Sequence, residues 1–224
     1  MVASGFLQRI PLFRNLTAEE LEMMRHVFQE REYKKNQVIF VEEDAGRFAY
    51  VVKFGELKVI QTSPDGRENI LAIHHAGDTF GEMSMIDGKT TPATVVAKED
   101  CRIISISKHH FDTVLMKNPR VILALLQILC GRLRESWKTI QVLKYNEAGM
   151  RIKQLLLNFA KSDGVSRPEG ILINLKITHQ EISEMVGVSR ETVSRAISRF
   201  QRQKYLFMDH HRFILLDHPF WREM

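Results

Sequence analysis

A short segment near the carboxyl end of the chain carries side chains that could read the edges of DNA base pairs. Arg190, Glu191 and Arg195 lie on one side of a stretch with helical periodicity. Arginine suits the O6 and N7 atoms of guanine, and glutamate suits the exocyclic amine of cytosine. Between residues 190 and 204 there are five basic residues and one acidic residue. A solvent-exposed helix face would also carry such charges. Their position in the helix therefore has to distinguish DNA recognition from simple exposure to solvent.

Two helices joined by a tight turn would position these side chains. Thr178 and Glu181 form a capping-box pattern that begins the first helix, and Gly187 supplies the turn. Ser189 can cap the second helix, whose first residue is then Arg190. Side chains at the N-terminal end of such a second helix reach base edges in the major groove, so charge and position agree. The predicted core between the two helices consists of Ile182, Val186, Val188, Val193 and Ile197.

The remainder of the C-terminal third is typical of a winged helix-turn-helix. The sequence predicts a helix over 150–161, an exposed loop over 163–170 and a strand over 171–175. A hairpin of strands 205–208 and 213–216 directly follows the second helix and would form the wing.

Short strands dominate the N-terminal half. The β-rich segments are 37–41, 48–53, 57–61, 68–73, 79–80, 94–97 and 102–107. Glycines separate several of them, and Ser63-Pro64-Asp65-Gly66 is a strong turn. The pattern predicts an antiparallel sandwich or barrel over roughly residues 30–108. Before it, Thr17 and Glu20 form a capping box that predicts a helix reaching Phe28.

After Pro119 the spacing changes to that of a long helix with a coiled-coil seam. The seam positions, four and three residues apart, are Ile122, Leu126, Leu129, Leu133, Ser136, Ile140 and Leu143, here called the 122–143 stripe. A second row, formed by Val121, Leu125 and Ile128, favours a helix that packs on the barrel with one face. The 122–143 stripe would then meet a second copy across a two-fold axis. Packing of the stripe on the chain's own barrel is the alternative.

Composition excludes several classes of protein. The chain has 224 residues, 44% hydrophobic and 26% charged, as expected for a soluble globular protein of one or two domains. No apolar run approaches the ~20 residues that cross a bilayer, and the start lacks a secretory signal core, so we expect a cytoplasmic protein with no membrane partner. A formal charge of +5 favours a polyanionic partner. No phosphate loop, metal-spaced cluster or nucleophile elbow is present, so we expect neither an enzyme nor a metal site.

The chain resembles the CRP/FNR family of bacterial transcription regulators. Segment 189–195, Ser-Arg-Glu-Thr-Val-Ser-Arg, is similar to the recognition helix of that family. The resemblance implies an α+β fold with an antiparallel β-roll of the jelly-roll (double-stranded β-helix) type in residues 1–118, a dimerisation helix in 119–145 and a winged helix-turn-helix in 146–224. The implied DNA contacts are Thr178, His179, Gln180, Ser189, Arg190, Glu191, Thr192, Ser194, Arg195, Ser198 and Arg199.

The resemblance also implies an operator and partners. Family members with Arg, Glu and Arg at positions 190, 191 and 195 read a TGTGA-like half-site, and those with Glu-x-x-Ser-Arg read a TTGAT-like one. This chain carries both signatures, so we expect a homodimer on a palindrome with a GA core. His179 is expected to contact a DNA phosphate. Segment 163–170 lies where relatives touch RNA polymerase, which is a further implied partner.

Residues 77–88 resemble the ligand cassette of the family, so the roll is expected to bind an effector that gates DNA binding allosterically. In its cyclic-nucleotide binders the equivalent of Glu82 accepts a hydrogen bond from the ribose, and an Arg-Ser pair holds the phosphate. Here Thr91-Pro92 stands in place of that pair. Neither side chain carries a positive charge, and proline has no backbone N–H to donate to a phosphate, which argues against cyclic AMP as the ligand. Lys89 or Arg132 could substitute. The candidate effector pocket is Gly81, Glu82, Met83, Thr91, Pro92, Ala93, Thr94, Arg132, Ser136 and Trp137, the last two aligning with the adenine-contacting pair of the family.

Other sensing chemistries stay open at this point, and the sequence does not identify the effector. The first thirty residues contain no cysteine, which argues against the iron–sulfur cluster of oxygen-sensing relatives. His74 and His75 lie near the position of haem ligands in other relatives, but neighbours on a strand point to opposite faces, so at most one faces the pocket. The roll could also be a vestigial or protein-binding module on a constitutive DNA-binding dimer.

Overall fold

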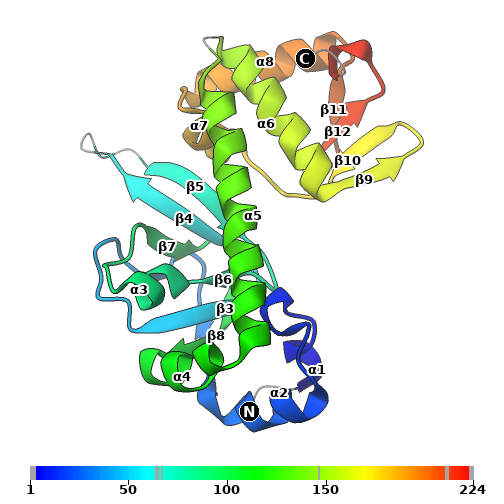
Figure 1. Ribbon diagram of the computed structural model, residues 1–224. Coiled ribbons are helices and arrows are strands. Elements are labelled where there is room, and N and C mark those ends of the chain that lie inside the picture. The colour runs from blue at the N-terminus through cyan, green and yellow to red at the C-terminus, as the bar shows by residue number, and fades with distance from the viewer. Residues whose placement is uncertain (1–3, 64–65, 67, 146, 210–211, 222–224) are drawn as a thin grey trace. The chain divides into compact units, whose positions relative to one another are not determined.

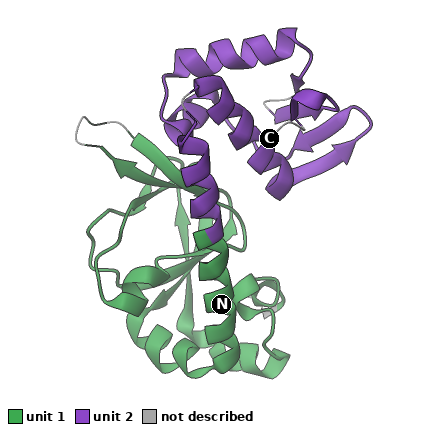
Figure 2. Cartoon of the chain, turned by 45° about the horizontal axis from the view of Figure 1, so that its top comes forward, with its two compact units in different colours: residues 1–133 green, residues 134–224 purple. Residues whose placement is uncertain are grey.

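The computed structural model describes residues 4–63, 66, 68–145, 147–209 and 212–221. The chain forms two compact units, residues 1–133 and 134–224, and the boundary falls inside the long helix α5 (Pro119–Leu143) (Figure 2). Of the turn predicted at 63–66, Pro64 and Asp65 lie outside the described residues.

The first unit is an antiparallel β-roll with short helices before the strands, after them and between β6 and β7 (Figure 1). Two four-stranded sheets are ordered β1-β8-β3-β6 and β2-β7-β4-β5. The strands are β1 (Phe28–Tyr33), β2 (Val38–Phe40), β3 (Phe48–Phe54), β4 (Leu57–Thr62), β5 (Glu68–His74), β6 (Thr79–Phe80), β7 (Thr94–Ala97) and β8 (Cys101–Ser107). The α-helices are α1 (Ser4–Leu7), α2 (Ala18–Met24), α3 (Glu82–Asp87) and α4 (Lys108–Thr113), with 3-10 turns η1 (Pro11–Phe13), η2 (Arg25–Val27) and η3 (Leu115–Lys117).

Strand β3 lies between two hydrophobic cores. Tyr50 and Val52 pack in the interior of the roll, whereas Ala49 and Val51 pack with the N-terminal helices and α5. Successive side chains of a strand point to opposite faces, so a strand covered on both sides reads as a continuous apolar run. The segments predicted as strands from sequence are confirmed within one or two residues at their ends.

Three segments differ from the sequence predictions. Helix α2 ends at Met24, and Phe28 begins strand β1, so the helix predicted to reach Phe28 is wrong. Strand β1 is an edge strand with mostly exposed polar side chains, and it therefore lacks an apolar alternation. Helix α4 was not predicted; Ser107 caps it by accepting the His110 N–H. Residues 164–167, predicted as loop, form strand β9, which pairs with the next strand.

Helix α5 buries one row of side chains and exposes another. Val121 and Leu125 are buried in the core that α5 shares with the roll and the N-terminal helices, as the second apolar row predicts. Members of the 122–143 stripe are about half exposed: Leu126 54%, Leu133 52%, Ile140 51% and Leu143 46%. Much of the stripe is therefore uncovered in a single chain.

Among the described residues no single helix has the length and apolarity of a membrane span. Residues 108–117 and α5 together have a sufficient length and composition, but the two helices are bent by 106°.

The second unit is a winged helix-turn-helix. Its helices are α6 (Ala148–Asp163), α7 (His179–Val186) and α8 (Arg190–Arg202), and the 3-10 turn η4 spans Pro219–Trp221. Its sheet, ordered β11-β12-β10-β9, contains β9 (Gly164–Arg167), β10 (Gly170–Ile173), β11 (Leu206–Asp209) and β12 (Arg212–Leu216). The core predicted between α7 and α8 is confirmed, with Val188 at its margin, and Val142 from the end of α5 joins it.

Candidate nucleic-acid interface and effector cavity

Hydrogen bonds define the start of α7 and the turn that joins α7 to α8. Thr178 and Glu181 make both bonds of the capping box at the start of α7. Gly187 ends α7 with φ of 66°, a left-handed conformation that glycine adopts without steric cost. Ser189 then accepts the Thr192 N–H at 3.2 Å and caps α8. The first turn of α8 therefore has a fixed direction relative to α7.

Helix α8 separates an apolar face from a charged one. Val193, Ala196, Ile197 and Phe200 are buried in the core of the unit. The exposed side chains are Arg190, Glu191, Arg195, Ser198, Arg199, Gln201 and Arg202, with Thr192 and Ser194 half-buried. The pKa of Glu191 is lowered by hydrogen bonds from its own N–H and from Ser189, with the nearby arginines adding to the effect. Glu191 is thus a hydrogen-bond acceptor between two cationic side chains.

His179 joins the two helices of the motif. Its Nδ1 lies 3.0 Å from Ser194 Oγ, and its ring stacks near Phe213 at a centroid distance of 6.5 Å. The other ring nitrogen, Nε2, is buried and has no partner among the described residues. The phosphate contact expected for His179 stays a prediction; in this structure the ring connects α7 to α8 through Ser194. Gln180, next to it, is exposed and donates to Glu184 at 2.6 Å.

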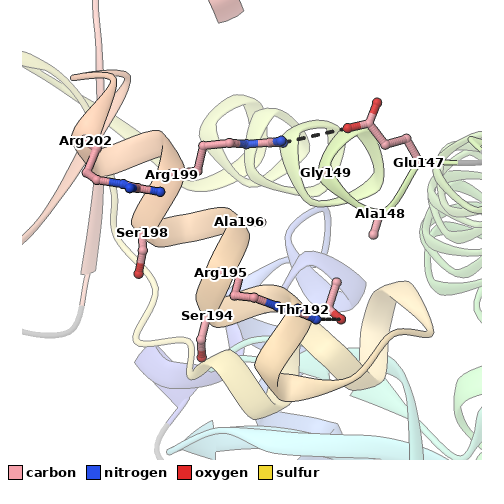
Figure 3. A pocket seen from close by; sticks show the side chains of 10 residues that line it. All are labelled: Glu147, Ala148, Gly149, Thr192, Ser194, Arg195, Ala196, Ser198, Arg199 and Arg202. Atoms are coloured by element: carbon pink, nitrogen blue, oxygen red, sulfur yellow. Dashed lines mark hydrogen bonds and ion pairs between the residues drawn. The ribbon is translucent and has the colours of Figure 1, made fainter.

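An open groove of about 590 Å³ runs between α8 and the start of α6 (Figure 3). Arg195, Arg199 and Arg202 line it from α8, four and three residues apart. Glu147 lines it from the other side, and its Oε1 lies 3.8 Å from Arg199 Nη2. A Cβ on Gly149 would lie 2.6 Å from the same Arg199 atom, which is the far end of a flexible side chain and could move aside.

The groove adds residues that the sequence predictions for the site omitted. Glu147, Ala148, Gly149 and Arg202 line it beside predicted residues of α8. The repeat of arginine at 195, 199 and 202 is the signal that points to Arg202. Nothing in the local sequence brings the start of α6 to α8, because that contact depends on packing of helices far apart in the chain.

The β-roll contains a cavity of about 270 Å³ beside α3. Six candidate pocket residues of the roll line it: Gly81, Glu82, Met83, Thr91, Pro92 and Ala93. Arg132 of α5 lines it as well. Thr94 does not line it, which corrects the sequence prediction, because successive residues of a strand alternate and its hydroxyl instead accepts the Glu42 N–H. Ser136 and Trp137 lie in α5 beyond the boundary of the first unit, so their role stays a prediction.

Glu82 and Arg132 form an ion pair in this cavity. Arg132 Nη1 donates to Glu82 Oε1, and Nη2 donates to the Thr79 carbonyl oxygen. Glu82 is 2% exposed, and its second oxygen has no partner among the described residues. The pair ties the middle of α5 to the start of α3.

Thr91 and Pro92 form hydrogen bonds with other segments of the roll. The Thr91 hydroxyl donates to the Val41 carbonyl at 2.7 Å and accepts the Asp44 N–H at 3.0 Å. The Pro92 carbonyl accepts from the Gln61 side-chain amide at 2.9 Å. This arrangement supplies neither the guanidinium nor the hydroxyl with which the Arg-Ser pair of cyclic-nucleotide binders holds a phosphate, so these two residues do not fit that ligand.

The two adjacent histidines point in different directions, as the strand geometry requires. His74 lines the cavity and stacks on Phe80 at a centroid distance of 5.6 Å. His75 Nδ1 lies 3.5 Å from Glu56 Oε1, and this contact with Lys98 nearby lowers the pKa of Glu56 to about 2. The prediction that at most one of the pair faces the pocket is confirmed.

Both units contain a segment that matches a known protein family. Residues 30–118 match the family model of the cyclic nucleotide-binding domain, and residues 150–219 match that of the Crp-like helix-turn-helix domain. The Cyclic AMP receptor protein of Thermus thermophilus is 32% identical over 187 residues, which cover 84% of this chain and 83% of the relative. The cAMP-activated global transcriptional regulator CRP of Haemophilus influenzae is 36% identical over 174 residues, 77% of this chain and 76% of the relative.

Solved structures show the same fold. A CooA variant from Carboxydothermus hydrogenoformans matches with a TM-score of 0.76 and 26% identity, covering 88% of this chain and 86% of that one. The c-di-GMP responsive global regulator CLP of Xanthomonas campestris matches with a TM-score of 0.75 and 25% identity, covering 90% of this chain and all of that one.

Proposed function

Because this chain belongs to the CRP/FNR family of transcription regulators, we propose that it works as a homodimer that reads a palindromic operator through α8 and is gated by an effector in the β-roll. The observation that carries the proposal is the exposed face of α8, where Arg190, Glu191 and Arg195 follow a fixed turn. The relatives are transcription regulators, and we propose a non-enzymatic, cytoplasmic role for this chain as well.

The 122–143 stripe supports the dimer. Its half-exposed leucines and isoleucine recur at the spacing of a coiled coil. Exposed apolar stripes of this kind are covered in stable proteins, and a two-fold axis allows the same stripe to cover itself. We propose 119–145 as the dimerisation segment, between an effector domain in 1–118 and a DNA-binding domain in 146–224.

The electrostatics of α8 support sequence-specific DNA binding. The capped N-terminus of α8 presents Arg190 and Glu191, which have the donor and acceptor patterns for guanine and cytosine. The arginines of the groove suit phosphates, because such contacts fix register without reading sequence. The proposed polar contacts to DNA are those of Thr178, His179, Gln180, Ser189, Thr192, Ser194 and Ser198. By resemblance to family members that carry the same residues, we propose a GA core in each half-site, of the TGTGA or TTGAT type.

The ion pair between Glu82 and Arg132 supports gating. It links the cavity to the helix that would form the dimer interface, so an effector that changes this pair can favour one arrangement of α5 over another. Only an effector with different affinity for the two arrangements can shift their populations. A dimer that binds DNA without an effector is the second candidate. It is favoured by the hydrogen bonds of the Thr91 hydroxyl within the roll.

The hairpin β9–β10 is a proposed contact for RNA polymerase.

Selection of DNA from a pool of random duplexes by the purified protein tests this function. We expect inverted repeats with a GA core, their half-sites spaced by about one helical turn, ~10 base pairs. Selection with the double variant Arg190→Ala/Glu191→Ala should yield no such consensus. Recovery of unrelated sequences by the wild-type protein would contradict the proposal.

A further inference from the structure

The polar side chains that line the cavity of the roll are engaged with the protein itself. The amide of Gln61 donates to Glu42 Oε1 at 3.1 Å and to the Pro92 carbonyl at 2.9 Å. The hydroxyl of Thr91 bonds within the 41–44 turn, as described above. A phosphate that entered the cavity would compete with the contacts that hold these strands together.

The charges that line the cavity are balanced. Among the described lining residues, Arg132 is the one permanent cation and Glu82 is the one carboxylate, and the two are paired. The third titratable lining residue, His74, has its Nδ1 3.7 Å from Asp78 Oδ2. If Arg132 turned to a phosphate, it would leave the carboxylate of Glu82 buried without its cation, which is strongly unfavourable.

The remaining walls are largely apolar. They are formed by Phe40, Val59, Leu71, Ala72, Phe80, Met83, Ala93 and Val95. Phe40 and Phe80 stack at a centroid distance of 6.0 Å with 29° between their planes, and His74 continues the stack. Leu71 and Met83 are half exposed at 51% and 47%. Such walls suit a small apolar or aromatic body, since ligand sites combine apolar walls with few polar anchors.

Glu82 is a lining residue with an unused hydrogen-bond acceptor. Its Oε2 is buried and has no partner among the described residues. Glu82 also lines a second space of about 20 Å³ beside Thr79, enough for one water molecule. A buried carboxylate oxygen accepts hydrogen bonds only, so a ligand that uses it has to present an N–H or O–H group.

We propose that the cavity binds an uncharged, largely apolar molecule with a hydroxyl or amino group for Glu82, and that it discriminates against anionic ligands such as cyclic nucleotides. The inference rests on the proposed role of the roll as an effector domain. It follows from three features together: the engaged donors, the internal charge balance and the apolar walls.

Isothermal titration calorimetry of the purified full-length protein with matched pairs of molecules tests the proposal. Adenosine and cyclic AMP share base and ribose and differ in the phosphate, tryptophol is compared with indole-3-acetate, and 2-phenylethanol is compared with phenylacetate. In at least one pair we expect the neutral molecule to bind about tenfold or more tightly than the anion. The double variant Thr91→Arg/Pro92→Ser should gain affinity for cyclic AMP by about the same factor relative to adenosine.

Three outcomes would overturn the proposal: tighter binding of the anion in any pair, no binding of any neutral molecule at millimolar concentration, or no gain in the double variant. DNA selection on the same preparation keeps the two proposals separate. A protein that selects inverted repeats but prefers cyclic AMP contradicts only this inference. A protein that prefers adenosine but selects no repeat contradicts only the DNA-binding proposal.

Discussion

His179 on α7 and Ser194 on α8 are joined by a 3.0 Å contact between Nδ1 and Oγ, so a histidine of α7 contacts the helix that carries the charged face. Burial lowers the pKa of His179, and the positive charge of Arg190 adds to the effect. Ser194 itself lies on the turn of α8 that follows Arg190 and Glu191. Protonation of the His179 ring would therefore change a contact with α8, the helix proposed to read DNA.

The lowered pKa of His179 predicts a pH-dependent stability. The unfolded chain takes up the proton at the ordinary pKa of 6.5, before the folded chain does. The contribution of His179 to the free energy of unfolding is therefore fully present above pH 6.5. It is lost as the pH falls toward the lower pKa that His179 has in the folded state. Urea unfolding at decreasing pH measures it. The His179→Gln variant should show a shallower loss below pH 6.5, and an identical slope in both proteins would contradict the prediction.

Arg190 should contribute to base recognition rather than to general affinity. Arg190→Ala should weaken binding to the selected operator by about 1–3 kcal/mol and relax the preference at one base pair. Arg202→Ala is the matched control, because this groove residue should weaken binding to all sequences alike and reduce the salt slope by about 1. Fluorescence anisotropy on operators with single base changes separates the two patterns. An unchanged preference in Arg190→Ala would show that α8 does not read the operator through this residue.

Glu147 should oppose DNA binding. Its carboxylate pairs with Arg199 in the groove and would lie beside the phosphates that Arg199 is proposed to contact. Glu147→Gln should therefore raise the affinity for both operator and random DNA by a similar factor. Glu169→Gln, which removes an exposed carboxylate at the β9–β10 turn, serves as the control for net charge. Equal effects of the two variants would contradict a specific role of the groove.

Much of the fold could be predicted from local sequence. The capping boxes at Thr17 and Thr178 and the left-handed Gly187 act through neighbouring residues, and the structure contains all three. Strand β1 could not be predicted, because an edge strand with polar faces gives no apolar alternation. Strand β9 could not be predicted either, since its backbone partners in β10 hold it.

The candidate sites were predictable in part. The charged face of α8 follows from helical spacing alone. The contact of His179 with Ser194 and the groove beside Glu147 depend on how α6, α7 and α8 pack. In the roll, the sequence itself shows that Thr91-Pro92 replaces the Arg-Ser pair of cyclic-nucleotide binders. The hydrogen bonds that occupy Thr91, however, come from a turn about fifty residues earlier in the chain.

The 122–143 stripe should control the oligomeric state. Ile140→Glu places a charge on the stripe, and burying it against a second copy would be costly, so the variant should sediment as a monomer. Thr139→Glu adds the same charge at the neighbouring exposed position and should leave the dimer intact. Analytical ultracentrifugation distinguishes the two. A dimeric Ile140→Glu variant would place the interface elsewhere.

The most direct test of the account compares two duplexes at one salt concentration. One carries the selected inverted repeat, and the other has the same composition with both half-sites scrambled. We predict that the dimer binds the inverted repeat at least about a thousandfold more tightly, as specific DNA-binding proteins do. Equal affinity for the two duplexes would contradict the claim that paired α8 helices read the operator.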